Sequence, residues 1–123
     1  MWLEQLYGNA LFSAGHIDEA LDHYQQSCAI QPRTEYCPYN IANIFLGRGQ
    51  FRDAIGEFDL ALRYTANRDM ALLCLNEKAE AQFQIGAYLT AETSVAQALA
   101  IDPSNTAALQ LRAQIAERNG GAN

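Results

Sequence analysis

Few side chains in this sequence have the types and the spacing that chemistry requires. The two histidines, His16 and His23, lie seven residues apart, and neither stands in a cysteine or glutamate pattern typical of a zinc site. Gly47-Arg48-Gly49 has neither the later glycine nor the preceding strand of a phosphate-binding loop. No triad of serine, histidine and aspartate can be inferred from residues this common, so we interpret these positions as exposed histidines and a turn.

Two acidic pairs are the remaining candidates for acid–base or metal chemistry. Glu77 and Glu80 are one helical turn apart, but nothing else in the sequence converges on them. Asp18 and Glu19 stand at the start of an expected helix, where acids favour the positive end of the helix dipole. We therefore expect solvated acidic faces, no enzymatic activity, no metal site and no cofactor.

The cysteines point to structure rather than to redox chemistry. There are three, Cys28, Cys37 and Cys74, an odd number that matches neither a metal-ligand pattern nor a CxxC motif. We expect either a reducing compartment or incidental buried thiols, and no disulfide framework.

Composition narrows the fold and the partners. Half of the 123 residues are apolar, and 21 alanines against 3 prolines favour an all-α fold. The net charge is −6 and the basic residues are scattered singly, which makes nucleic acid an unlikely partner. No apolar run approaches the ~20 residues of a membrane helix, and no basic segment opens a signal peptide. We expect a soluble, cytoplasmic protein with no direct membrane insertion.

An internal repeat organises the elements that carry these residues. The segment Gly15–Ala20 recurs 34 residues later as Gly49–Ala54 and 37 residues after that as Gly86–Ala91. Six columns of equivalent residues run through the three copies. They are Gly8/Ala42/Ala79, Gly15/Gly49/Gly86, Ala20/Ala54/Ala91, Tyr24/Phe58/Val95, Ser27/Ala61/Ala98 and Pro32/Ala66/Pro103.

Each column has a mechanical role. Small residues let two helices approach closely, the glycine closes one helix in a left-handed conformation, and the final proline stops the second helix. One unit is thus helix, tight turn, helix, stop. The pattern predicts helices near 2–14, 18–30, 38–48, 52–65, 70–84, 88–101 and 105–118, with Pro38 in the first turn of its helix and Asp18, Asp102 or Ser104 offering capping oxygens.

These columns resemble the tetratricopeptide repeat (TPR) family, whose 34-residue unit carries small, glycine, aromatic, alanine and proline positions in this order. The resemblance implies a right-handed superhelical α-solenoid of about seven helices. Lys78 and Gln82 occupy sites that are apolar in the family. They predict either looser packing of the third unit or an ammonium of Lys78 that reaches outward.

The resemblance implies a single domain over residues 1–118. Its units are 1–34, 35–68 and 72–105, followed by a capping or truncated-repeat helix at 105–118 and a flexible tail at 119–123. The last helix is expected to pack through one side and to leave a polar side outward, as the end of a solenoid requires. The packing side consists of Ala108, Leu109, Ala113 and Ala116, and the outward side of Gln110, Gln114, Glu117 and Arg118.

TPR proteins bind partner peptides or helices on the concave surface lined by the first helix of each unit, which implies the same here. A stripe on these helices carries large apolar residues at both ends and amides or an acid between them. The predicted groove residues are Gln5, Asn9, Phe12, Tyr39, Asn40, Asn43, Leu46, Asn76, Glu80 and Phe83. Amides suit a peptide backbone because they both donate and accept. Alternatively, the aromatic residues pack against neighbouring helices.

One TPR subfamily clamps the C-terminal carboxylate of chaperones with two asparagines and three bases. Asn9 and Asn40 match, but the basic positions hold Gln5, Leu73 and Glu77, so chaperone tails are unlikely ligands. A partner segment that is apolar with a basic or neutral end fits better.

We therefore expect a non-catalytic interaction module that binds a partner protein in the groove. The alternatives are a small acidic TPR chaperone similar to those of secretion translocators, and a scaffold that self-associates through its solenoid ends.

Overall fold

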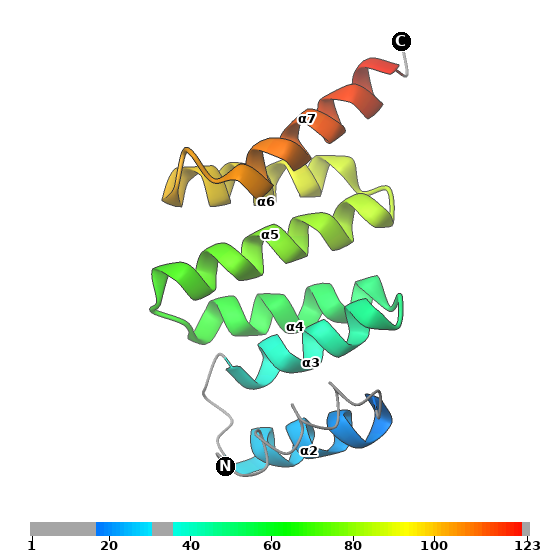
Figure 1. Cartoon of the computed structure of the whole chain (residues 1–123), viewed down its shortest axis with the longest axis vertical. Helices are drawn as coiled ribbons and strands as arrows, with labels where there is room; N and C mark the ends of the chain where they lie inside the picture. Colours follow the sequence, from blue (N-terminus) through cyan, green and yellow to red (C-terminus); the bar gives the residue numbers. More distant parts are fainter. Residues whose placement is uncertain (1–16, 31–35, 122–123) are drawn as a thin grey trace.

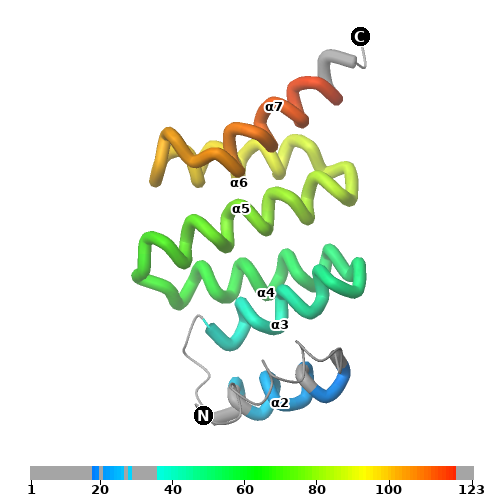
Figure 2. Tube along the Cα trace, viewed as in Figure 1, coloured from blue at the N-terminus to red at the C-terminus, as the bar shows by residue number. Residues whose placement is uncertain are grey.

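The computed structural model describes residues 17–30 and 36–121, and within them it is all-α (Figure 1). The helices are α2 (Ile17–Ile30), α3 (Tyr36–Gly47), α4 (Phe51–Tyr64), α5 (Arg68–Gln84), α6 (Tyr88–Ile101) and α7 (Thr106–Gly121). The helix expected near 2–14 lies outside the described residues. Along the Cα trace the helices run back and forth and stack in chain order, with α2 and α7 at opposite ends (Figure 2). This confirms the predicted solenoid of helix-turn-helix units.

The turn glycines close the first helix of the second and third units as predicted. Gly49 and Gly86 have φ of 76° and 77°, the left-handed region in which glycine is favoured. After α3, the amide of Gln50 donates to the carbonyl of Phe45, five residues earlier, at 2.8 Å. This is the wider-spanning hydrogen bond of a Schellman motif, and Ala87 donates to Gln82 in the same way after α5. Gly15, the equivalent glycine of the first unit, lies outside the described residues.

The small residues of the repeat are the points of closest packing. Six repeat alanines are fully buried, namely Ala42, Ala54, Ala61, Ala79, Ala91 and Ala98, and the large residues that they surround, Tyr24, Phe58 and Val95, are at most 2% exposed. Among the other repeat positions, Ala20 lies within α2, Pro103 is exposed after α6, and Gly8 and Pro32 lie outside the described residues. The columns therefore mark the core, as their spacing predicts.

The helix ends agree with the sequence in part. Pro38 is the third residue of α3 and so lies in its first turn. The side chain that caps α7 is Asn105, whose Oδ1 accepts from the amide of Ala108 at 2.9 Å, whereas Asp102 accepts from Ser104 instead. Asp18 lies inside the first turn of α2. At the other end, α7 continues three residues past Arg118, the end expected from the sequence.

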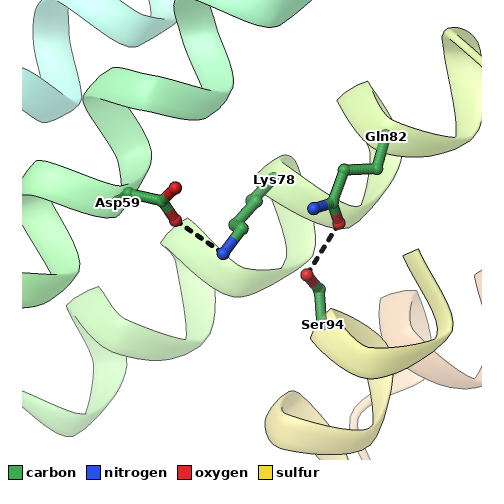
Figure 3. Close-up of polar contacts among 4 residues, drawn as sticks. All are labelled: Asp59, Lys78, Gln82 and Ser94. Carbon is green, nitrogen blue, oxygen red and sulfur yellow. Dashed lines mark hydrogen bonds and ion pairs between the residues drawn. The ribbon is translucent and has the colours of Figure 1, made fainter. Parts of the chain in front are cut away.

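The third unit solves its two polar substitutions with specific partners (Figure 3). Lys78 points from α5 toward α4, where its Nζ lies 2.5 Å from Oδ1 of the half-exposed Asp59. Its side chain is only 18% exposed, so the ammonium is paired with a neighbouring helix rather than extended into solvent. Gln82 is 7% exposed, and its Oε1 accepts a 2.7 Å hydrogen bond from the hydroxyl of Ser94 on α6. The buried amide is thus satisfied.

The absence of disulfides expected from the sequence is wrong. Cys28, near the end of α2, is bonded to Cys37, the second residue of α3, with 5.4 Å between their Cα atoms. The repeat pattern did not predict this disulfide. Cys28 and Cys37 belong to neighbouring units and are not equivalent positions of the repeat, so aligning the units does not pair them. Disulfides are rare in reducing compartments, so this bond weighs against the reducing compartment expected from the sequence. The cytoplasmic location stays a prediction.

The packing side predicted for α7 is also wrong in part. Ala108, Leu111 and Ile115 are the buried residues, at 1%, 5% and 1% exposure. Leu109 is half-buried, and Ala113 and Ala116 are exposed. The spacing of alanines pointed to the wrong stripe because the larger residues Leu111 and Ile115 bury more apolar surface when they face α5 and α6.

Candidate functional site

The first helices of successive units are joined directly by side chains, and this defines the candidate face. Tyr39 on α3 donates its hydroxyl proton to Oε1 of Glu77 on α5 at 3.2 Å. Further along, Nδ2 of Asn76 on α5 donates to Oδ1 of Asn105, the residue that caps α7, at 3.0 Å. We call the surface formed by α3, α5 and the start of α7 the first-helix face.

Glu77 on α5 differs from an ordinary surface glutamate in its pKa and in its hydrogen bonding. Burial raises the pKa of its carboxyl group above the ordinary value, and the hydrogen bond from Tyr39 opposes that rise. Its second oxygen, Oε2, is buried without a hydrogen-bond partner among the described residues. Because a buried charge without full pairing is costly, this carboxylate gains from a donor that the described part of the chain does not supply.

Tyr39, which donates the hydrogen bond to Glu77, is itself held in place by an aromatic contact. Its ring lies against Phe58 on α4, with 6.2 Å between the ring centroids, and its pKa is raised, mainly by burial. The side chain is therefore held by apolar packing on one side while its hydroxyl stays with Glu77.

Asn76 carries a second acceptor of the same kind. Its Oδ1 is buried and has no hydrogen-bond partner among the described residues, although its amide nitrogen is bonded to Asn105. Asn76 and Glu77 thus place two adjacent unpaired acceptors on the same segment of α5. A buried acceptor without a donor costs free energy, so both oxygens would be stabilised by a donor.

Two exposed apolar residues lie in the first halves of α3 and α5. Tyr36 on α3 is 49% exposed, and Leu73, the equivalent residue in α5 by the repeat, is 46% exposed. Each lies about one helical turn before Tyr39 or Glu77, so exposed apolar side chains stand beside the polar pair.

Other predicted groove residues are occupied by the protein itself. Nδ2 of Asn43 donates to the carbonyl of Tyr39 in its own helix at 3.1 Å. Leu46 packs against the core around Phe58. Phe83 packs against Tyr88, with ring centroids 5.4 Å apart, and against the guanidinium of Arg118 at 5.7 Å. For these residues the packing alternative describes the structure.

The remaining predicted residues divide into two groups. Glu80 is exposed and accepts from Gln84 at 3.0 Å, and Asn40 is half-buried on α3. Gln5, Asn9 and Phe12 lie outside the described residues. Among the predicted residues, Tyr39 is hydrogen-bonded to Glu77, and Asn76 is hydrogen-bonded to Asn105.

Neither Glu77 nor Asn105 was predicted as a site residue. Asn105 had a signal, because an asparagine directly before an apolar helical run is typical of a helix start. For Glu77 the signal was its place at a position that is basic in one TPR subfamily. Within the described ranges, no group of histidine, cysteine, aspartate and glutamate residues could hold a metal ion. No helix there is both long and apolar enough to cross a membrane.

No family model and no curated protein matches this sequence. Solved structures do. The first TPR domain of Spaghetti (RPAP3), bound to the HSP90 peptide SRMEEVD, matches with a TM-score of 0.86 and 23% identity over 97% of this chain and 92% of that one. This chain has the TPR fold.

Two further TPR domains support this assignment. The second TPR domain of human RPAP3, in complex with the HSP70 peptide SGPTIEEVD, has a TM-score of 0.80 and 20% identity and covers 91% of each chain. The TPR domain of Sgt2 from Aspergillus fumigatus also reaches 0.80, with 21% identity over 98% of this chain and 82% of that one. At these identities the likeness concerns the fold.

Proposed function

We propose that this TPR domain is a non-catalytic interaction module whose first-helix face binds a segment of a partner protein. Glu77 is the observation that carries the proposal. A half-buried carboxylate with one unpaired oxygen, one helical turn after the exposed Leu73, suits an apolar segment that brings a hydrogen-bond donor or a positive charge.

The structural neighbours support a peptide ligand but not the same peptide. Two of them are solved with peptides that end in EEVD and so carry several acids and a terminal carboxylate. In this chain, Leu73 and Glu77 stand where the carboxylate-clamping subfamily has bases. A negative peptide end placed there meets another negative charge instead of a fork of donors.

The proposal is tested by binding of fluorescent peptides to the full chain. The acidic probe is SRMEEVD with a free carboxylate, and its counterpart is SRMKKVN with an amidated end. We expect the counterpart to bind at least about tenfold more tightly, since like-charge contacts cost more than about 1.4 kcal/mol. Equal affinity, or tighter binding of the acidic probe, contradicts the proposal.

A pair of substitutions gives the same test a gain of function. Glu77→Arg combined with Leu73→Lys restores two bases at the clamp positions and is expected to create binding of SRMEEVD. Asp22→Arg on α2, outside the first-helix face, changes the net charge by the same sign and serves as the control. Binding gained equally by the control would show a general charge effect rather than recognition at Glu77.

The chaperone alternative stays a prediction. It requires a client protein that is insoluble alone and becomes soluble when this chain is co-expressed with it.

A further inference from the structure

The last helix has two apolar faces, and only one of them is covered. Successive residues of a helix are about 100° apart, which sets Ala108, Leu111 and Ile115 on one face of α7 and Leu109, Ala113 and Ala116 on another about 120° away. The first face is buried. On the second, Ala113 and Ala116 are exposed and Leu109 is only half-buried. We call this second set the open face.

The repeat shows what normally covers such a face. By the repeat spacing, the residues of α5 equivalent to Leu109 and Ala113 are Leu75 and Ala79, which are 6% and 0% exposed. They are buried because α6 packs on them through Ala91, Val95 and Ala98. Within the described residues, no helix takes the place on α7 that α6 takes on α5. The open face thus corresponds to a surface that is covered by a helix in the preceding unit.

A groove continues the open face onto α6. It has a volume of about 550 Å³ and is lined by Val95, Ala96, Leu99 and Ala100 of α6 and by Arg112 of α7, with Glu92 at its edge. Arg112 belongs to the same side of α7 as Leu109, Ala113 and Ala116, since it lies three residues from the first and four from the last. Ala96 and Ala100 on the α6 wall, and Ala113 and Ala116 on the open face beside the groove, let another helix approach closely.

The charges of α6 and α7 indicate which partner the groove binds. Glu92 and Arg112 are opposite charges at the groove, and neither forms an ion pair with another described residue. Residues 88–121 contain three acids and two bases, a net charge of −1 out of the −6 of the chain. Residues 17–30, in the helix at the other end of the stack, contain three acids and no lysine or arginine. Two copies of this acidic chain therefore repel one another less through α6 and α7 than through α2. A two-fold arrangement through α6 and α7 sets Glu92 of each copy near Arg112 of the other.

We propose that the groove and the open face bind a second copy of this chain in a two-fold dimer. The open face of α7 from each copy lies in the α6–α7 groove of the other, and two Glu92–Arg112 pairs fix the register. The dimer leaves the first-helix face free, so it pairs two interaction modules end to end.

The first test is sedimentation of the full 123-residue chain between about 1 µM and about 1 mM, the range of weak specific association. Wild type is expected to shift from monomer to dimer. Ala113→Glu places a charge in the apolar contact and is expected to weaken dimerisation at least about tenfold. The control, Gln114→Glu, adds the same charge on the polar face of α7 and is expected to leave the dimer unchanged. A monomer throughout, or equal effects of both variants, overturns the proposal.

Charge reversal tests the pairing itself and keeps the proposal falsifiable should Ala113→Glu unfold the chain. Glu92→Arg alone and Arg112→Glu alone each create two repulsive pairs and are expected to be monomeric. Mixing the two variants restores both pairs, so the mixture is expected to form heterodimers. If the mixture stays monomeric while wild type dimerises, the two-fold pairing is wrong. Peptide binding at the first-helix face is measured separately and does not depend on this outcome.

Discussion

Two junctions between helices begin from the same repeat positions and are held together differently. Where α2 meets α3, the buried Tyr24 packs with Cys37, and Cys37 is bonded to Cys28. Where α4 meets α5, the equivalent Phe58 packs with Cys74, which is not disulfide-bonded.

The difference depends on one residue outside the repeat columns. Thirty-four residues after Cys28 comes Leu62, which packs against the buried cluster around Phe58 and against the cluster formed by α5, α6 and α7. The first junction is thus covalent, and the second is held by apolar packing, with the Lys78–Asp59 pair at its edge. The repeat columns determine which parts of two helices pack together. Residues outside the columns determine whether a disulfide or apolar packing joins them.

The largest effect is expected from removing the side chain at the centre of the second junction. Phe58 is fully buried, so Phe58→Ala leaves a cavity among Ala54, Met70 and Cys74 and should cost about 3–5 kcal/mol of unfolding free energy. Urea unfolding followed by circular dichroism measures it. A loss below about 1 kcal/mol would mean that packing does not hold this junction.

The first junction can be broken without creating a cavity. Cys28→Ser removes the disulfide, which closes a sequence separation of nine residues, and should cost about 2–3 kcal/mol. In the variant, the Cys37 thiol still lies 3.5 Å from the carbonyl of Tyr24 and can donate to it. A reductant should lower the unfolding free energy of wild type by the same amount and leave the variant unchanged. Equal sensitivity of both proteins to reductant would contradict a covalent junction.

The third unit allows a sharper version of the comparison, because a polar pair stands there at a usually apolar site. Ser94→Ala leaves Oε1 of the buried Gln82 without its donor and should cost about 1–3 kcal/mol. Adding Gln82→Leu removes the stranded acceptor, so the double variant should recover most of the loss. Additive losses in this double-mutant cycle would show that the two residues do not act as a pair.

The sequence predicted the scaffold well because packing constraints repeat. Gly49 and Gly86 adopt the left-handed conformation that their place requires, and the repeat alanines of α3 to α6 are buried. The residue type at these positions is determined by a local geometry that recurs in every unit. A single sequence is therefore sufficient to find them.

The candidate site was predicted less well because it depends on pairs from different units. Glu77 was not chosen as a site residue, since its role comes from Tyr39 on another helix. Phe83 was predicted to face a ligand, yet it contacts Tyr88 and Arg118. The Cys28–Cys37 bond was missed for the same reason. A repeat period reports which residues are equivalent, but it does not report which of them meet across helices.

The smallest effect concerns the contact between α3 and α5, where Glu77 joins two units through a titratable group. Its pKa is raised in the folded chain, mainly by burial, so the fold favours the protonated carboxyl. Stability should therefore fall as the pH rises from the ordinary glutamate value of about 4.3 through the raised pKa. Glu77→Gln can still accept from Tyr39 but carries no charge, so it should be more stable than wild type at pH 7. That advantage should shrink as the pH falls to about 4, and thermal unfolding of both proteins across this range measures it. If the advantage of the Glu77→Gln variant stays constant with pH, the effect does not come from the burial of a charge.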